Sequence, residues 1–244
     1  MADQQRITAM RTGGKHLRSV KQQLAAFTTV GTRFEDIEAL AQELIKAAGA
    51  KPSFSTVKDY QWATCIMKND EMCHGIPRGK VVEDGDVITI DVGLIYDVYL
   101  LDTTTSFGCG KVTPAAAEFL AVGQKTLAKA IAKARVGNSI YDISYALQHE
   151  VEQHGYGAVF QLTGHGIGKQ LHMEPNVPCI AQRSDKRKHL EIGQTLAIEI
   201  MYAAGDAYLV VANDGWTYRT KDGSLAGMFE ETVLITDKEP EILT

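Results

Sequence analysis

Cysteine is scarce in this sequence, and the spacing of the four that occur excludes two common kinds of cross-link. Cys65, Cys73, Cys109 and Cys179 include no C-x-x-C pair, so the pattern indicates neither a structural zinc cluster nor a disulfide framework. A chain of 244 residues buries a core large enough to need neither. We therefore expect reduced thiols, as in a cytoplasmic protein.

Long apolar runs and an excess of positive charge are also missing. No apolar run approaches the ~20 residues of a membrane span, and the polar start Met1–Gln5 lacks the apolar segment of a signal peptide. A formal net charge of −5 argues against a protein that binds nucleic-acid phosphates, and we interpret the basic run 186–188 as a solvated loop. We expect a soluble cytoplasmic protein with no membrane partner and no direct nucleic-acid specificity.

Apolar residues recur at intervals of three and four in four segments, which predicts four amphipathic helices. Proline, glycine and serine stand near their ends, where they favour helix starts and stops. The predicted helices are Lys15–Thr28, Arg33–Ala48, Ala115–Arg135 and Ser139–His154. Irregular to strand-like structure is expected over 51–72, and a polar loop over 179–190.

Two strand-like runs in the first half of the chain each contain an aspartate. Asp91 lies in the β-branched run 87–92, and Asp102 lies in the run 97–107. A hairpin with Tyr96 and Asp97 near its turn would bring both carboxylates to one face. An aspartate inside an apolar strand is costly unless it is paired, hydrogen-bonded or bound to metal, so Asp91 points to function.

The second half repeats this arrangement with glutamates. Glu199 lies in the apolar run 195–202, and Glu230 lies in the run 228–236. Each pair of acidic strands follows a pair of predicted helices. The order therefore suggests two related halves that face one another across a shared site.

Gly164–Pro175 places His165 and His172 among glycines, which let the backbone approach whatever the imidazoles face. Four crowded carboxylates would repel one another and hold protons at neutral pH, and divalent cations remove that cost. Such an oxygen-rich set with one nitrogen suits two ions of Mn, Fe or Co, with Zn also suitable. The five candidate ligands are Asp91, Asp102, His165, Glu199 and Glu230.

These residue types predict metal-assisted hydrolysis, most readily of an amide. Two metal ions can hold and activate a bridging water, and Glu199 can carry the proton of that water to a leaving amine. His74 and His172 are further imidazoles able to donate hydrogen bonds to a developing oxyanion. Considered alone, His74 before Gly75 is more typical of a structural turn.

Together these segments resemble methionine aminopeptidase. The combined pattern is far more specific than any one motif, and it runs in order through nearly the whole chain. The matching segments are CHGIP (73–77), IDV with Asp91, DTTTSF with Asp102, GHGIGxxxHxEP (164–175), IE with Glu199 and DGWTYRTKDGSLAGMFEET (214–232).

The resemblance implies the pita-bread fold, an α/β (α+β) fold whose two pseudo-symmetric halves form an antiparallel sheet covered by helices. It implies one catalytic domain over 1–244, with two divalent ions (Co, Mn, Fe or Zn) between the halves. By that resemblance Asp91 chelates one ion, His165 and Glu199 hold the other, and Asp102 and Glu230 bridge them.

The same resemblance implies the substrate and the residues that bind it. The family removes the initiator methionine from nascent chains whose second residue is small, so we expect a cytoplasmic monomer, and a transient ribosome association would suit that role. His74 and His172 would bind substrate and stabilise the tetrahedral intermediate. The pocket positions for the methionine side chain are occupied by Tyr60, Cys65, Trp216 and Leu171, the last standing where Phe is usual.

Several positions depart from the family pattern, although none is a predicted ligand. The short segment between His172 and Glu199 leaves no room for the helical subdomain of type II enzymes, so the chain resembles the short bacterial type I form. By strand alternation Glu231 should point away from the side chain of Glu230. The departures are Gly93, Leu101, Met173, Ile200 and Glu231.

Two alternatives stay open at the level of sequence. A proline-directed aminopeptidase or prolidase of the same fold would use the same five ligands, although those relatives usually carry a large additional N-terminal domain. A non-catalytic pita-bread binding protein would typically have lost ligands, whereas all five are present here.

Overall fold

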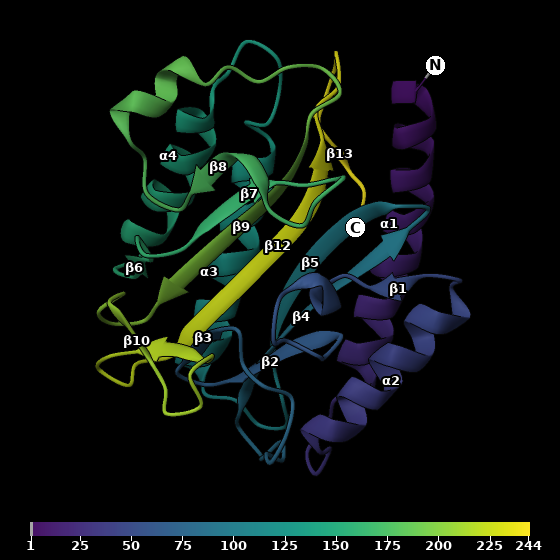
Figure 1. Cartoon of the computed structure of the whole chain (residues 1–244). Coiled ribbons are helices and arrows are strands. Elements are labelled where there is room, and N and C mark those ends of the chain that lie inside the picture. Colours follow the sequence, from purple (N-terminus) through teal and green to yellow (C-terminus); the bar gives the residue numbers. More distant parts are fainter. Residues whose placement is uncertain (1) are drawn as a thin grey trace.

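The computed structural model describes residues 2–244, which form one large sheet, one small sheet and four helices within that range (Figure 1). The helices are α1 (Ala2–Phe27), α2 (Phe34–Ala47), α3 (Pro114–Ile131) and α4 (Ile140–Glu152), with short 3-10 turns η1 (Phe54–Thr56) and η2 (Arg183–Arg187). The strands are β1 (Lys51–Pro52), β2 (Thr64–Lys68), β3 (Glu71–Cys73), β4 (Val87–Tyr96), β5 (Tyr99–Gly108), β6 (Gly157–Ala158), β7 (Thr163–Gly166), β8 (Met173–Pro178), β9 (Thr195–Ala203), β10 (Leu209–Val211), β11 (Tyr218–Thr220), β12 (Ala226–Leu234) and β13 (Glu241–Ile242).

The large sheet has ten strands, with the main order β1-β4-β5-β12-β9-β7-β8, and every pairing in it is antiparallel. Helices α1 and α2 lie beside the β4–β5 half, and α3 and α4 lie behind the β9–β12 half (Figure 1). Each half buries its own apolar cluster between its helices and its strands. The sequence-based expectation of two helix-plus-strand halves is thereby confirmed, as is the antiparallel sheet covered by helices.

The two halves meet at β5 and β12, whose backbones pair at only two positions. Thr103 lies opposite Glu231, and Thr104 lies opposite Glu230. In contrast, β4 and β5 pair over ten positions and β9 and β12 over nine. We call this two-pair junction the seam.

Two hydroxyl groups continue the seam where the strands move apart. Ser106 Oγ donates to the carbonyl oxygen of Met228 at 2.8 Å and accepts from its N–H at 3.0 Å. Thr232 Oγ1 does the same for Asp102, donating to its carbonyl at 2.8 Å and accepting from its N–H at 3.1 Å. Each hydroxyl lies two residues beyond the Thr104–Glu230 pair, so the junction has local twofold symmetry.

The first helix begins well before the predicted Lys15. Gly13 and Gly14 made that part of the chain resemble a break, because glycine is a poor helix former. A Cβ on Gly13 would lie 2.8 Å from Tyr96 Cβ, and one on Gly14 would lie 2.5 Å from the carbonyl oxygen of Leu243. The glycines therefore let α1 lie close against the sheet and the C-terminal segment.

The other helix predictions hold with small changes at the ends. The Thr113 hydroxyl accepts from the N–H of Ala116 at the start of α3, and Ser139 forms a capping box with Asp142 at the start of α4. However, α3 ends at Ile131 rather than Arg135, and the segment expected to be a loop over 179–190 contains η2.

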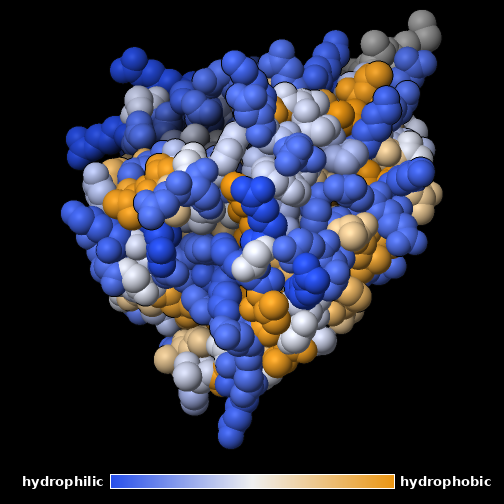
Figure 2. Space-filling view, turned by 60° about the horizontal axis from the view of Figure 1, so that its bottom comes forward, coloured by the Kyte–Doolittle hydropathy of each residue, from blue (hydrophilic) through white to orange (hydrophobic). Residues whose placement is uncertain are grey.

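The surface carries mostly hydrophilic residues on the face shown in Figure 2, where hydrophobic residues form small separate groups. Among residues 2–244, no helix is both long enough and apolar enough to cross a membrane. In the same range the four cysteines are buried and free, as the sequence predicted.

The seam predicts a stability effect for Thr232→Val, which keeps the side-chain shape and removes the hydroxyl. The buried N–H and C=O of Asp102 would lose their partner, so the free energy of unfolding should fall by about 1–3 kcal/mol. Urea unfolding measures this change. Thr105→Val is the matched control, because Thr105 is half-buried and points to the opposite face of β5 from Thr104. Equal losses of stability in the two variants would contradict a special role for the seam.

Candidate metal centre

One row of side chains runs across both halves of the large sheet. Cys65 pairs with Asp91, Asp91 with Thr104, Thr104 with Glu230, and Glu230 with Glu199. Residues directly opposite one another on antiparallel strands point to the same face. The seam therefore places carboxylates from both halves side by side.

The remaining candidate ligands join this row by strand alternation. Asp102 lies two residues before Thr104 on β5, so it shares that face with Asp91, as the predicted hairpin required. His165 on β7 lies opposite Ala197, two residues before Glu199 on β9. One face of the sheet thus gathers the five candidate ligands, which are far apart in sequence.

This face forms the floor of a cavity of about 280 Å³. All eleven candidate residues from the sequence line it, so the structure brings every one of them together. They are Tyr60, Cys65, His74, Asp91, Asp102, His165, Leu171, His172, Glu199, Trp216 and Glu230.

The four carboxyl groups are buried so deeply that none is more than 6% exposed. Burial raises the pKa of Asp91 to about 7, and burial together with the charge of Asp91 raises the pKa of Glu199 to about 8. Burial and neighbouring carboxylates also raise the pKa of Asp102 and of Glu230 well above the ordinary range. Without a cation, this cluster would hold protons at neutral pH.

The donor set fits divalent metal ions. Ligand atoms of Asp102, His165 and Glu230 lie within 4.8 Å of one another, and carboxylates with an imidazole suit Mn, Fe, Co and Zn. The hydroxyl of Thr104 lies 2.9 Å from Asp91 Oδ1 and 2.8 Å from Glu230 Oε2. It can donate its one proton to either carboxylate, so it orients the ligands of both halves.

The three histidines of the cavity are neutral near pH 7. Burial and the neighbouring His172 lower the pKa of His165 to about 4, and its Nδ1–H donates to the carbonyl oxygen of Gly166 at 3.0 Å. Nε2 of His165 is therefore left as the nitrogen that can bind a metal. Burial also lowers the pKa of His74 and of His172.

His74 adopts a φ of +56°, a backbone conformation that residues other than glycine rarely take. Its ring packs edge-on against Tyr218 at 5.6 Å between centroids. The sequence around His74 predicted a turn, whereas the structure has an irregular segment over 74–76, directly after β3, followed by a bend at 77–79. This segment directs the imidazole into the cavity.

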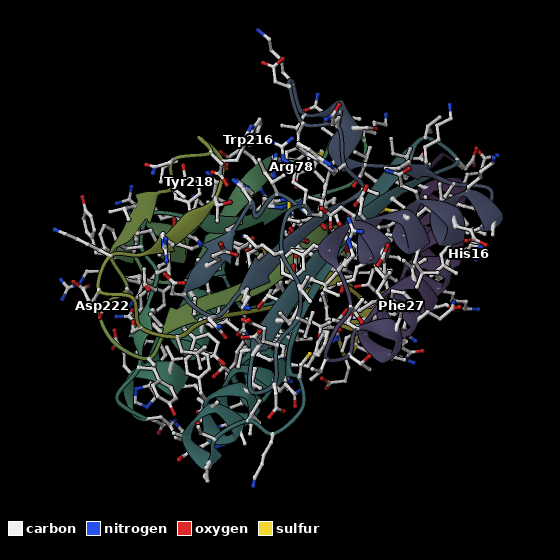
Figure 3. The ribbon with its side chains drawn as sticks, turned by 90° about the horizontal axis from the view of Figure 1, so that it is seen from below. His16, Phe27, Arg78, Trp216, Tyr218 and Asp222 are labelled. Carbon is white, nitrogen blue, oxygen red and sulfur yellow. The ribbon has the colours of Figure 1, made fainter. Side chains whose placement is uncertain are left out.

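One end of the cavity is lined by aromatic and apolar side chains. Tyr60 lies edge-on to Trp216 and to Trp62, each at 5.1 Å between ring centroids, and its hydroxyl donates to the carbonyl oxygen of Thr64 at 2.8 Å. Trp216 and Arg78 appear on the same side of the molecule in Figure 3, opposite α3 and α4. Separate loops therefore build one aromatic wall.

Most departures from the family pattern point away from this cavity. Leu101 and Ile200 are buried in the two apolar clusters between the sheet and its helices. Glu231 forms an ion pair with Lys21 of α1, which confirms that it points away from Glu230. Met173 is 37% exposed and does not line the cavity.

Gly93 is the departure that lies on the cavity side of its strand, opposite Asp102. A Cβ on Gly93 would lie 2.1 Å from Ser53 Oγ and 2.9 Å from the carbonyl oxygen of Leu101. Ser53 therefore fills the space that a larger side chain at Gly93 would need.

Sequence reasoning did not single out Thr104, although it contacts two predicted ligands. Its position two residues after Asp102 was the available signal, since alternate residues of a strand share a face. Gln161, Leu162 and Thr163 also line the cavity. Gln161 and Leu162 come from the irregular segment before β7, and Thr163 is the first residue of that strand.

Comparison with known proteins agrees with this geometry. The chain matches the model of metallopeptidase family M24 over residues 8–237. It is 37% identical to a methionine aminopeptidase of Clostridium acetobutylicum, over 98% of this chain and 95% of that protein. The crystal structure of methionine aminopeptidase from Thermotoga maritima superposes with a TM-score of 0.95 at 34% identity, covering 98% and 96% of the two chains.

A prolidase from Pyrococcus horikoshii is a more distant neighbour. It superposes with a TM-score of 0.78 at 23% identity, and this chain covers 62% of its length. That similarity shows a shared fold only.

The raised pKa values predict that the metal-stripped protein loses stability as the pH rises. A carboxyl group whose pKa is raised on folding stabilises the protein below its unfolded value, 3.8 for Asp91 and 4.5 for Glu199. That contribution disappears as the pH passes the folded values of about 7 and about 8. The buried histidines, whose pKa values are lowered, oppose this trend only below their ordinary pKa of 6.5, where the unfolded chain binds protons that the folded protein does not.

The midpoint of thermal unfolding should therefore fall between about pH 6.5 and pH 8.5 in metal-stripped protein. Saturating Mn²⁺ should remove most of this fall, because a bound cation stabilises the ionised carboxylates. A midpoint that stays constant over this range without metal would contradict the predicted protonation of the cluster.

Proposed function

Because the chain belongs to metallopeptidase family M24, and within it to the methionine aminopeptidases, we propose that it removes the N-terminal methionine from polypeptides. The observation that carries this proposal is the row of carboxylates across the seam, which ends beside an apolar pocket. The row suits metal-dependent hydrolysis of an amide, and the pocket suits an apolar side chain.

We assign the five donors to two divalent ions. In this assignment Asp91 would hold one ion, His165 and Glu199 would hold the other, and Asp102 and Glu230 would contribute to both. Such ions, when bound, lower the pKa of a water and polarise a carbonyl group. Asp102 lies on β5 and Glu230 on β12, the two strands of the seam. Their closeness to both halves supports their role as bridges.

Proton transfer falls to Glu199, and stabilisation of the developing oxyanion falls to the neutral histidines. The carboxylate of Glu199 accepts a proton from the attacking water and delivers it to the leaving amine. His74 and His172 line the same cavity and donate hydrogen bonds to the carbonyl oxygen as it gains negative charge. Their lowered pKa values leave the imidazoles neutral, with one N–H each.

The methionine side chain occupies the apolar end of the cavity. Tyr60, Cys65 and Leu171 are each at most 6% exposed, and Trp216 packs against Tyr60. An apolar pocket of this kind gains about 0.8 kcal/mol for each buried methylene. It therefore favours a long apolar side chain over a shorter one.

The substrates in this proposal are nascent polypeptides with a small second residue. Relatives named methionine aminopeptidase support this class of substrate. A cytoplasmic monomer that meets chains at the ribosome would suit that role.

Hydrolysis of two tripeptides tests the proposal. Metal-stripped protein resupplied with Mn, Co, Fe or Zn should release methionine from Met-Ala-Ser and leave Ala-Pro-Ala intact. Cleavage of Ala-Pro-Ala would instead indicate a proline-directed enzyme, and stoichiometric metal binding without turnover would indicate a binding protein.

Glu199→Gln checks the proton-transfer step in the same assay. It should lower kcat by about 10²–10⁴-fold with the fold retained by circular dichroism. Glu239→Gln, at a side chain that is 78% exposed, is the control and should retain full turnover. Normal activity of Glu199→Gln would show that another group moves the proton.

Trp216→Ala tests the pocket. Removing the indole should lower the preference for methionine over alanine at the first position by about 10-fold or more, as expected for lost apolar contact. Trp62→Ala removes the ring on the other side of the Tyr60 cluster, outside the cavity lining. A similar side-chain profile in both variants would contradict the placement of the methionine side chain.

A further inference from the structure

Lys21 reaches the seam from α1, on the side of the sheet opposite the cavity. Its Nζ lies 2.6 Å from Glu231 Oε1 and 2.8 Å from Thr103 Oγ1. The Lys21 and Glu231 side chains are only 12% and 20% exposed. This ion pair is therefore largely removed from water.

The carboxylate of Glu231 has further partners on its second oxygen. Thr244 Oγ1 donates to Glu231 Oε2 at 2.7 Å and accepts from the N–H of Thr232 at 2.8 Å. Thr103 Oγ1 lies 3.1 Å from the same carboxylate oxygen. One carboxylate thus connects α1, β5, β12 and the segment after β13.

The residues of this network sit directly behind the predicted ligands. Thr103 and Glu231 form one of the two backbone pairs of the seam. The N–H of Thr103 donates to Asp102 Oδ1 at 3.0 Å, and Thr103 Oγ1 lies 2.9 Å from the carbonyl oxygen of Glu230. A shift of Thr103 would therefore move the carboxylate of Asp102 directly and would move the backbone that carries Glu230.

We propose that Lys21 and Glu231 are a positioning pair, which fixes the spacing of β5 and β12 so that Asp102 and Glu230 can share metal ions. The inference rests on the metal site of the proposed function. Two backbone pairs would otherwise hold this junction, with the Ser106 and Thr232 hydroxyls beside them. The ion pair adds a further connection at the positions where ligand spacing matters most.

Charge gives the pair a second role. Glu231 is adjacent to Glu230, so it places a fifth carboxylate near four others. The ammonium of Lys21 neutralises it at 2.6 Å. Removing only Lys21 would leave a largely buried carboxylate without its counter-charge, which favours a rearrangement of β5 and β12.

The same helix provides a matched control. Arg11 of α1 forms an ion pair with Glu241 of β13 at 2.7 Å, but these side chains are 43% and 36% exposed. That pair ties α1 to the edge of the sheet and contacts no predicted ligand. Its loss should affect the protein only through ordinary surface contacts.

Calorimetric titration of metal-stripped protein with Mn²⁺ tests the inference, together with kcat and KM for Met-Ala-Ser. Lys21→Met should weaken Mn²⁺ affinity by about 10–100-fold, as observed when groups that orient metal ligands are removed, and should lower kcat more than it raises KM. Lys21→Arg keeps the charge and should recover part of both. Arg11→Met should match the unaltered protein in both measurements.

The double variant Lys21→Met/Glu231→Gln removes both charges and separates positioning from general destabilisation. It should bind Mn²⁺ more tightly than Lys21→Met alone, and it provides the test if Lys21→Met does not fold. Unaltered Mn²⁺ affinity and kcat in Lys21→Met would overturn the inference, as would unaltered values in the double variant if Lys21→Met does not fold. Failure of the unaltered protein to bind Mn²⁺ would instead overturn the metal site itself.

Discussion

The two-pair seam between β5 and β12 is the constraint on which the rest of the structure depends. Within the large sheet it is the place where strands of the two helix-covered halves pair, and the candidate ligands lie on it or beside it. Because Thr104 and Glu230 pair there, Asp91 and Glu199 on the next strands fall in the same row. A change in register by one residue would turn every ligand of one half to the opposite face.

Burial of the acidic row links stability to activity. Four carboxyl groups buried together are unfavourable when ionised, and their raised pKa values record that cost. Divalent cations offset it, so the arrangement that destabilises the metal-free site also gives it affinity for metal. The Thr104 hydroxyl and the Lys21–Glu231 pair then act on the two faces of the same strands.

Much of this arrangement followed from local patterns in the sequence. The position of Asp91, Asp102, Glu199 and Glu230 within strand-like runs predicted them as candidate ligands, because a buried carboxylate needs a partner. Strand alternation also predicted the opposite directions of Glu230 and Glu231. The start of α1 was missed because Gly13 and Gly14 serve close packing against residues that are distant in sequence.

Other features could not be derived from the sequence, because they depend on long-range register. Lys21 and Glu231 are 210 positions apart, and no motif links the two. Ser53 fills the space beside Gly93, although the two lie on different elements. Such contacts depend on how separate elements pack together, and the periodicity within one element gives no information on that packing.

Anomalous diffraction from crystals loaded with Mn²⁺ tests the central claim, that the row across the seam is a site for two metal ions. The account predicts two peaks in each chain, about 3.5–4 Å apart. One should lie beside Asp91 and the other beside His165 and Glu199, with Asp102 and Glu230 between them. A single peak, or peaks outside the cavity, would contradict it.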